Sequence, residues 1–97
     1  MKRFSWSPEK NEKLQQERGI SFEEIVFHIE NGDVLEVTEH PNQQKYGGQR
    51  VLSVLINRYV YLVPLVETED EIFLKTIIPS RKATKRHLRG QTNNGET

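Results

Sequence analysis

The stretch RVLSVLINRYVYLVPLVETEDEIFLKTII, residues 50–78, decides the fold of this chain. It is rich in Val, Ile, Leu and aromatic residues, which favour strands, and short polar segments interrupt it at two points. The first is the pair Asn57-Arg58, a candidate two-residue turn, and the second is residues 67–70. Segments joined this tightly should pair antiparallel. The predicted strands are residues 50–56, 59–66 and 71–78.

A further strand is predicted upstream, from Val34 to Thr38, where the sequence is short and β-rich. The polar loop of residues 40–48 separates it from the strand that follows. Pro64 lies inside the predicted strand 59–66, and proline cannot donate a hydrogen bond to a ladder. We therefore expect Pro64 at a sheet edge or at a β-bulge.

Two helices are predicted before the strands. The first covers residues 8–18, between Ser7 as the N-cap and Gly19 as the stop. The second begins with the capping box formed by Ser21 and Glu24. Its apolar residues recur at the spacing of one helix face: Phe22, Ile25, Val26 and Ile29.

Ser80 should cap a last helix, predicted from Arg81 to about Leu88. The residues beyond it, 90–97, are polar and are expected to form a disordered tail. Two helices, four strands and one helix predict an α+β fold with a four-stranded antiparallel sheet. The chain of 97 residues has the size of one domain, which we place at residues 1–89.

The composition excludes several classes of protein. The chain is 34% hydrophobic and 29% charged, with a mean hydropathy of −0.73. No apolar run approaches the roughly 20 residues that cross a bilayer, and we see no secretory signal after the N-terminus. The sequence has no cysteine, which rules out disulfides, thiol catalysis and Cys-ligated zinc. We expect a cytoplasmic protein without a membrane partner.

The net charge is zero, but the charges are segregated along the chain. Acidic residues are concentrated in residues 67–71, whereas all the charged residues in the segment 75–89 are lysines and arginines. Those cations are Lys75, Arg81, Lys82, Lys85, Arg86 and Arg89. Such an asymmetry indicates a basic face, which is either an anion-binding surface or an ordinary solvated helix face.

The start of the last helix is the most informative part of this basic segment. Arg81 and Lys82 lie in its first turn, where the helix dipole disfavours each cation by about 0.3–1 kcal/mol. The same terminus presents unpaired backbone N–H groups, which favour an anion. We interpret the combination as a phosphate site. The alternative is that one of the two cations pairs with a carboxylate such as Glu67.

The remaining cations of the helix extend this surface. Lys82, Arg86 and Arg89 recur at the spacing of one face, and Arg81 and Lys85 share the neighbouring face. Their mutual repulsion is a cost that a polyanion such as RNA would relieve. Cations elsewhere that could join the same surface are Lys75 on the last strand, Arg50 at the start of the strand 50–56, and Lys45 in the preceding loop.

No other arrangement of residues suggests catalysis. His28, His40 and His87 lack metal-ligand spacing, and nucleotide-binding glycine motifs are missing. No metal or cofactor is therefore expected. His40 is kept as a reserve candidate for acid–base chemistry, and His87 is expected to pack or to cap.

Three blocks of the chain resemble the BrnT family in the same order. They are Phe4-Ser5-Trp6-Ser7-Pro8-Glu9-Lys10-Asn11, then Arg18-Gly19 followed by Ile20-Ser21-Phe22-Glu23-Glu24, then Ile77-Ile78-Pro79-Ser80-Arg81-Lys82-Ala83-Thr84. The resemblance spans roughly residues 4 to 89, and the three blocks taken together are moderately specific. BrnT proteins are toxins of type II toxin–antitoxin pairs with a RelE-like ribonuclease fold.

The resemblance implies RNA cleavage and a ribbon-helix-helix antitoxin, and it implies that DNA is bound only through the toxin–antitoxin complex. Carried over to matching positions, it makes Arg81 and Lys82 functional candidates, together with Lys75 and Arg50. In the resulting hypothesis Arg50 and Arg81 stabilise the phosphate. The two lysines serve in acid–base or steering roles, while Lys45, Lys85, Arg86 and Arg89 bind RNA.

A different class of function remains open. The domain could be a non-catalytic binding module whose basic helix docks an acidic segment of the antitoxin. Direct DNA binding is a weaker alternative, because the pI of about 6.8 is low for a protein that binds DNA by itself.

Overall fold

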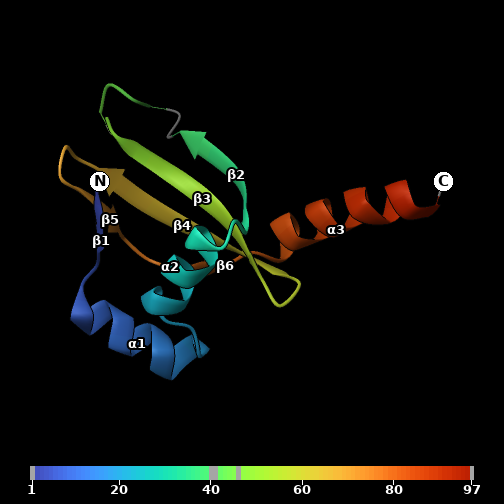
Figure 1. Ribbon diagram of the computed structural model, residues 1–97, viewed down its shortest axis with the longest axis horizontal. Helices are drawn as coiled ribbons and strands as arrows, with labels where there is room; N and C mark the ends of the chain where they lie inside the picture. The colour runs from blue at the N-terminus through green and yellow to red at the C-terminus, as the bar shows by residue number, and fades with distance from the viewer. Residues whose placement is uncertain (1, 40–41, 46, 97) are drawn as a thin grey trace.

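The computed structural model describes residues 2–39, 42–45 and 47–96, and the side chains among them up to residue 88. Three helices and a six-stranded sheet form one α+β unit, as predicted at the level of fold class (Figure 1). The elements are β1 (Arg3–Ser5), α1 (Pro8–Arg18), α2 (Phe22–Glu30), β2 (Val34–Glu39), β3 (Gln49–Ile56), β4 (Tyr59–Glu67), β5 (Glu71–Leu74), β6 (Ile78–Pro79) and α3 (Arg81–Glu96).

The prediction of four wholly antiparallel strands is wrong in two respects. The sheet order is β1-β5-β4-β3-β2, with β6 also paired to β4, and β1 pairs with β5 in parallel. β1 is only three residues long, so no alternation in the sequence marks it as a strand. The predicted strand 71–78 is divided, because the chain leaves the ladder after Leu74 and rejoins β4 at Ile78.

Pro64 lies on the central strand β4, whereas the sequence predicts a sheet edge or a β-bulge at this position. It faces the break between β5 and β6, so no strand opposite it requires the N–H that proline lacks. Its carbonyl oxygen accepts a hydrogen bond from the Lys75 backbone N–H at 2.8 Å. The expectation of an edge or a bulge is therefore wrong, and an interruption in the neighbouring strand accommodates the proline instead.

The central hairpin has the predicted two-residue turn. Asn57 and Arg58 adopt positive φ angles of 51° and 66°, as a type I′ turn requires. The turn sets the register of β3 against β4, pairing Ile56 with Tyr59 and continuing without a shift to Gln49 opposite Val66. This register decides which side chains share each face of the sheet.

The two N-terminal helices have the predicted ends. The Ser7 side chain accepts a hydrogen bond from the Lys10 N–H, and Gly19 ends α1 with a left-handed φ of 67°. Ser21 caps α2 by accepting from the Glu24 N–H at 3.2 Å. Short polar caps therefore fix both helices, and the tight link between them makes the pair a compact unit.

The core lies between this helix pair and one face of the sheet. Alternate residues of the hairpin point toward the helices and are buried, together with side chains of α1, α2 and β5. The members are Leu14, Ile20, Phe22, Ile25, Leu52, Val54, Ile56, Val63, Leu65, Leu74 and Ile77. The opposite face of the sheet is the one against which α3 packs.

α3 is longer than predicted: its backbone stays helical through Gly90 to Glu96, where we expected an end near Leu88. A glycine inside a helix costs only about 1 kcal/mol relative to alanine, so it does not by itself end one. The helix extends away from the sheet in Figure 1. The expected disorder of residues 90–97 stays a prediction, and Thr97 lies outside the described residues.

Candidate functional site

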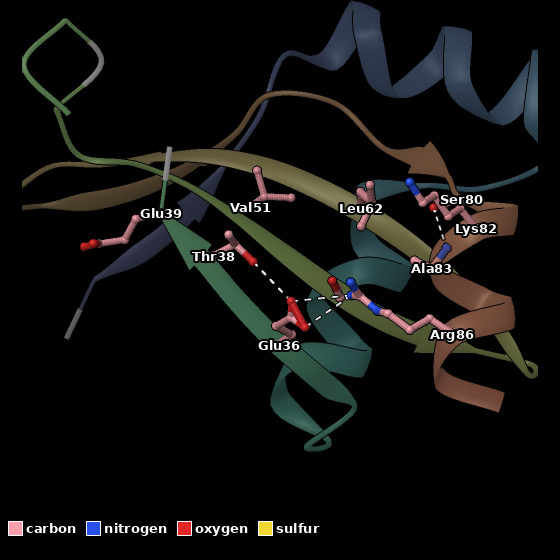
Figure 2. Close-up of a pocket in the computed structure, with 10 residues that line it drawn as sticks. Glu36, Thr38, Glu39, Val51, Leu62, Ser80, Lys82, Ala83 and Arg86 are labelled. Atoms are coloured by element: carbon pink, nitrogen blue, oxygen red, sulfur yellow. Dashed lines mark hydrogen bonds and ion pairs between the residues drawn. The ribbon is translucent and has the colours of Figure 1, made fainter. Parts of the chain in front are cut away.

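A cleft of about 440 Å³ opens between the N-terminal half of α3 and the second face of the sheet. Figure 2 shows β2 as one wall, α3 as the other and the hairpin strands as the floor. Its lining residues are Glu36, Thr38, Glu39, Val51, Ser53, Leu62, Ser80, Lys82, Ala83 and Arg86. The cleft therefore joins an apolar floor to charged walls.

The strand register produces this lining. Glu36 pairs with Ser53 and Thr38 with Val51, which places all four side chains on the face turned away from α1 and α2. Leu62 of β4, opposite Ser53, completes the floor. A one-residue slip of β2 would turn Glu36 and Thr38 away from the cleft, so the register is a condition for the site.

Hydrogen bonds hold the first turn of α3 against β4 on one side, and its other side is exposed to solvent. The Ser80 hydroxyl accepts a hydrogen bond from the Ala83 N–H at 3.0 Å. The buried Thr84 hydroxyl donates to the Ser80 carbonyl oxygen at 2.7 Å and accepts from the Val60 N–H at 2.8 Å. These contacts hold the helix on β4 while the side chains of Arg81 and Lys82 stay exposed.

Lys82 and Arg86 are one turn apart, and both reach the cleft. Arg86 Nη2 contacts Glu36 Oε1 at 3.2 Å and Oε2 at 3.5 Å, which joins α3 to β2 across the cleft (Figure 2). The Thr38 hydroxyl donates to Glu36 Oε2 at 3.4 Å. The predicted RNA-binding residue Arg86 is therefore already paired with a carboxylate.

Lys75 lies on the same face of the sheet as the cleft. Its Nζ is 3.5 Å from Gln49 Oε1, and Gln49 pairs with Val66 on that face. The Lys75 side chain is exposed. The structure thus brings Lys75, Lys82 and Arg86 to one face, and Arg81 is the exposed neighbour of Lys82 in the first turn of α3.

Arg50 does not join them, because it points to the opposite face. It is opposite Leu65 of the core face, and its Nη1 contacts Glu67 Oε1 at 3.1 Å. Lys2 Nζ contacts the other oxygen of the same carboxylate at 2.6 Å. The hydrogen bond and charge of Lys2, followed by the charge of Arg50, hold the pKa of the Glu67 carboxyl below its ordinary value.

The contacts of Glu67 also bear on the alternative that Arg81 or Lys82, in the first turn of α3, pairs with this carboxylate. Glu67 binds Lys2 and Arg50, not Arg81 or Lys82. No ion pair joins Arg81, Lys82 or Lys85 to any acidic residue in the part of the chain that the structure describes.

Other predicted residues contribute less to this picture. Lys45 is an exposed loop residue whose backbone N–H bonds to the Asn42 side chain at 3.2 Å, and it is not among the residues that line the cleft. His40 lies outside the described residues, and the Arg89 side chain lies beyond the last described side chain.

The described histidines lie away from the cleft lining. His28 Nδ1 is 2.7 Å from Asp33 Oδ2, and this hydrogen bond lowers the pKa of the Asp33 carboxyl. His87 is half-buried, and its Nε2 has no hydrogen-bond partner among the side chains and backbone that the structure describes. Among residues 2–39, 42–45 and 47–96, no three His, Asp or Glu side chains gather as metal ligands would.

Sequence reasoning missed the acidic wall of the cleft. Glu36 and Thr38 alternate along a predicted strand, which places them on one face, but no local signal shows that this face meets α3. The contact between Glu36 and Arg86 spans 50 residues, so it depends on the sheet order.

Comparisons with known protein families, with curated proteins and with solved structures find no match to this chain. The resemblance to BrnT toxins therefore rests on the three sequence blocks alone. Among the described residues, no helix is long and apolar enough to cross a membrane.

Proposed function

We propose that this chain is the cytoplasmic toxin of a type II toxin–antitoxin system, with a RelE-like fold and a metal-independent endoribonuclease activity. The observation that supports it most is the first turn of α3. Two exposed cations, Arg81 and Lys82, have no acidic partner among the described residues, and Lys82 lines a cleft that also holds Arg86. Uncompensated cations at a helix N-terminus suit a phosphate group.

The chemistry assigned to the cleft follows from what RNA cleavage without a metal needs. A base takes the proton of the 2′-hydroxyl, cations surround the phosphate, and an acid protonates the leaving 5′-oxygen. Arg81 and Arg86 are suited to the phosphate, because a guanidinium matches its geometry. Lys82 and Lys75 are the candidates for acid–base or steering roles. Arg50 keeps its predicted role only as a hypothesis, since it lies on the other face with Glu67.

The test is growth after induction of this chain alone, beside the double variant Arg81→Ala/Lys82→Ala. We expect the wild type to arrest growth and the variant to allow it, because the variant loses both cations at the phosphate site. The matched control is Lys10→Ala/Lys13→Ala on α1, which removes the same charge far from the cleft. Circular dichroism checks that all the proteins fold. A folded Arg81→Ala/Lys82→Ala variant as toxic as the control contradicts the proposal.

A second candidate function is a non-catalytic module that only binds a ribbon-helix-helix antitoxin. The apolar part of the cleft, formed by Val51 and Leu62 of the floor and Ala83 of the α3 wall, favours it, since such a surface suits a polypeptide side chain. Co-purification with the product of the neighbouring gene, combined with an RNA cleavage assay, separates the two. A stable complex without cleavage of any RNA by the free chain supports the module and rejects the enzyme.

A further inference from the structure

Arg86 is the only cation of the cleft with an acidic partner among the described residues. Glu36 approaches it from the facing wall, and both carboxylate oxygens lie within 3.2–3.5 Å of Nη2. A single nitrogen of the guanidinium makes these contacts. An arginine side chain has five N–H donors and can bind an anion through two nitrogens at once, so this contact leaves the guanidinium short of the bidentate pairing that a phosphate can offer.

The ion pair between Arg86 and Glu36 is exposed and can be displaced by another anion. The side chains of Arg86 and Glu36 are 62% and 42% exposed, and ion pairs this exposed contribute little to stability. Arg50 shows the contrast within the same molecule. Its partner Glu67 is only 26% exposed and is held by Lys2 as well, so an incoming anion would have to displace a carboxylate bound by two cations.

The surroundings of Glu36 make it a competitor for an anion in the cleft. Its carboxylate lies in the cleft that Lys82 also lines. Lys82 is one helical turn before Arg86 on α3. A phosphate that enters this cleft meets a negative charge already placed against Arg86. Like charges in one site oppose each other, so the phosphate gains Arg86 only as Glu36 gives it up.

We infer that Glu36 is the resident anion of the cleft, which occupies Arg86 until a backbone phosphate of single-stranded RNA displaces it. The inference rests on the proposed function for the choice of RNA as ligand. It assigns to Glu36 an autoinhibitory contact: the carboxylate lowers the affinity of the empty cleft for RNA and is released as RNA binds.

The experiment measures binding of a short, fluorescently labelled 2′-O-methyl oligonucleotide by anisotropy. This probe lacks the 2′-hydroxyl nucleophile and cannot be cleaved, so binding is read separately from catalysis. We expect Glu36→Gln to bind about 1.5- to 5-fold more tightly than the wild type, the range that an exposed ion pair supports. Arg86→Gln should bind more weakly, and Glu36→Gln should gain clearly less in that background than in the wild type, because only the direct repulsion between Glu36 and the phosphate is then removed.

The matched control is Glu12→Gln, which removes the same charge from the exposed surface of α1. An equal gain in Glu12→Gln and Glu36→Gln overturns the inference, because net charge would then explain both. A gain from Glu36→Gln that is undiminished in the Arg86→Gln background also overturns it, as does failure of every variant to bind. Failure of the proposed function is detected by a separate cleavage assay. In that case the wild type would leave unmodified RNA intact, although the variants still bind the oligonucleotide with the expected relative affinities.

Discussion

In the block Ser80-Arg81-Lys82-Ala83-Thr84, some residues fix α3 on the sheet and others are exposed to solvent. Ser80 caps the helix, Ala83 is buried against the sheet, and Thr84 bonds the helix to β4. Only Arg81 and Lys82 extend outward. A motif that is noticed as a unit therefore combines three residues that position the helix with two that are free to contact a ligand.

At this scale the replacement Thr84→Val tests the anchoring of α3. Valine has nearly the same shape but leaves the buried Val60 N–H without its acceptor. We expect a loss of about 1–3 kcal/mol in the free energy of unfolding, measured by urea denaturation. Thr84→Ser keeps the hydroxyl and should lose clearly less. Equal stability of wild type and Thr84→Val would show that the hydroxyl does not hold the helix.

At the scale of elements, α1 and α2 are joined by a buried side chain. Asn11 of α1 is 9% exposed, and its Oδ1 accepts from the Phe22 N–H at 2.8 Å, at the start of α2. Its Nδ2 donates to Glu23 Oε1, also at 2.8 Å. One amide thus satisfies a free N–H of the second helix and fixes how the two helices meet.

We expect Asn11→Ala to destabilise the protein by about 1–3 kcal/mol, because it leaves the Phe22 N–H unsatisfied. Asn11→Asp is an informative companion. The aspartate can still accept from Phe22 but cannot donate to Glu23, and it places two negative charges side by side. It should therefore remain less stable than the wild type near neutral pH. A thermal melt unchanged by both replacements would refute this account of the junction.

At the scale of the whole molecule, the two faces of the sheet have different characters. One face is closed by α1 and α2 over the core, and the ion-paired cluster of Lys2, Arg50 and Glu67 lies at its rim. The other face carries α3 at one end and the open cleft beside it. Charge is compensated on the first face and left partly free on the second.

The cluster around Glu67 predicts how stability depends on pH. Because the pKa of Glu67 is lowered by folding, its carboxylate stabilises the folded state above the ordinary glutamate pKa of about 4.3. This contribution is lost as the pH falls through the lowered pKa. Glu67→Gln should be less stable than the wild type at neutral pH, and the difference should shrink toward acid. Urea denaturation across this range checks it, and a constant difference contradicts it.

Local patterns predicted the parts of the fold that are local. The caps at Ser7 and Ser21, the stop at Gly19 and the turn at Asn57 all depend on residues close in sequence. The pairing of β1 with β5, the break after Leu74 and the extension of α3 depend on distant partners or on the absence of a stop. No short stretch of the sequence therefore indicates these features.

The same limit applies to the candidate site. Arg81, Lys82 and Arg86 were recognised because one helix carries them at regular spacing. Arg50 was grouped with them although alternation along β3 turns it to the other face, and Glu36 was overlooked although it meets Arg86. Which charges share a surface is decided by the order of the strands.

The parallel pairing of β1 with β5 has a consequence for the order in which the chain folds. Arg3 is paired with Glu71, so this contact closes a far longer loop than the β3–β4 hairpin, whose closest pair is Ile56 with Tyr59. Closing a long loop costs more chain entropy, and contacts distant in sequence slow folding. The hairpin that forms the floor of the cleft should therefore assemble early, with the N-terminal strand adding last. Loss of that strand would then fray the side of the sheet farthest from β2 before it disturbs the cleft.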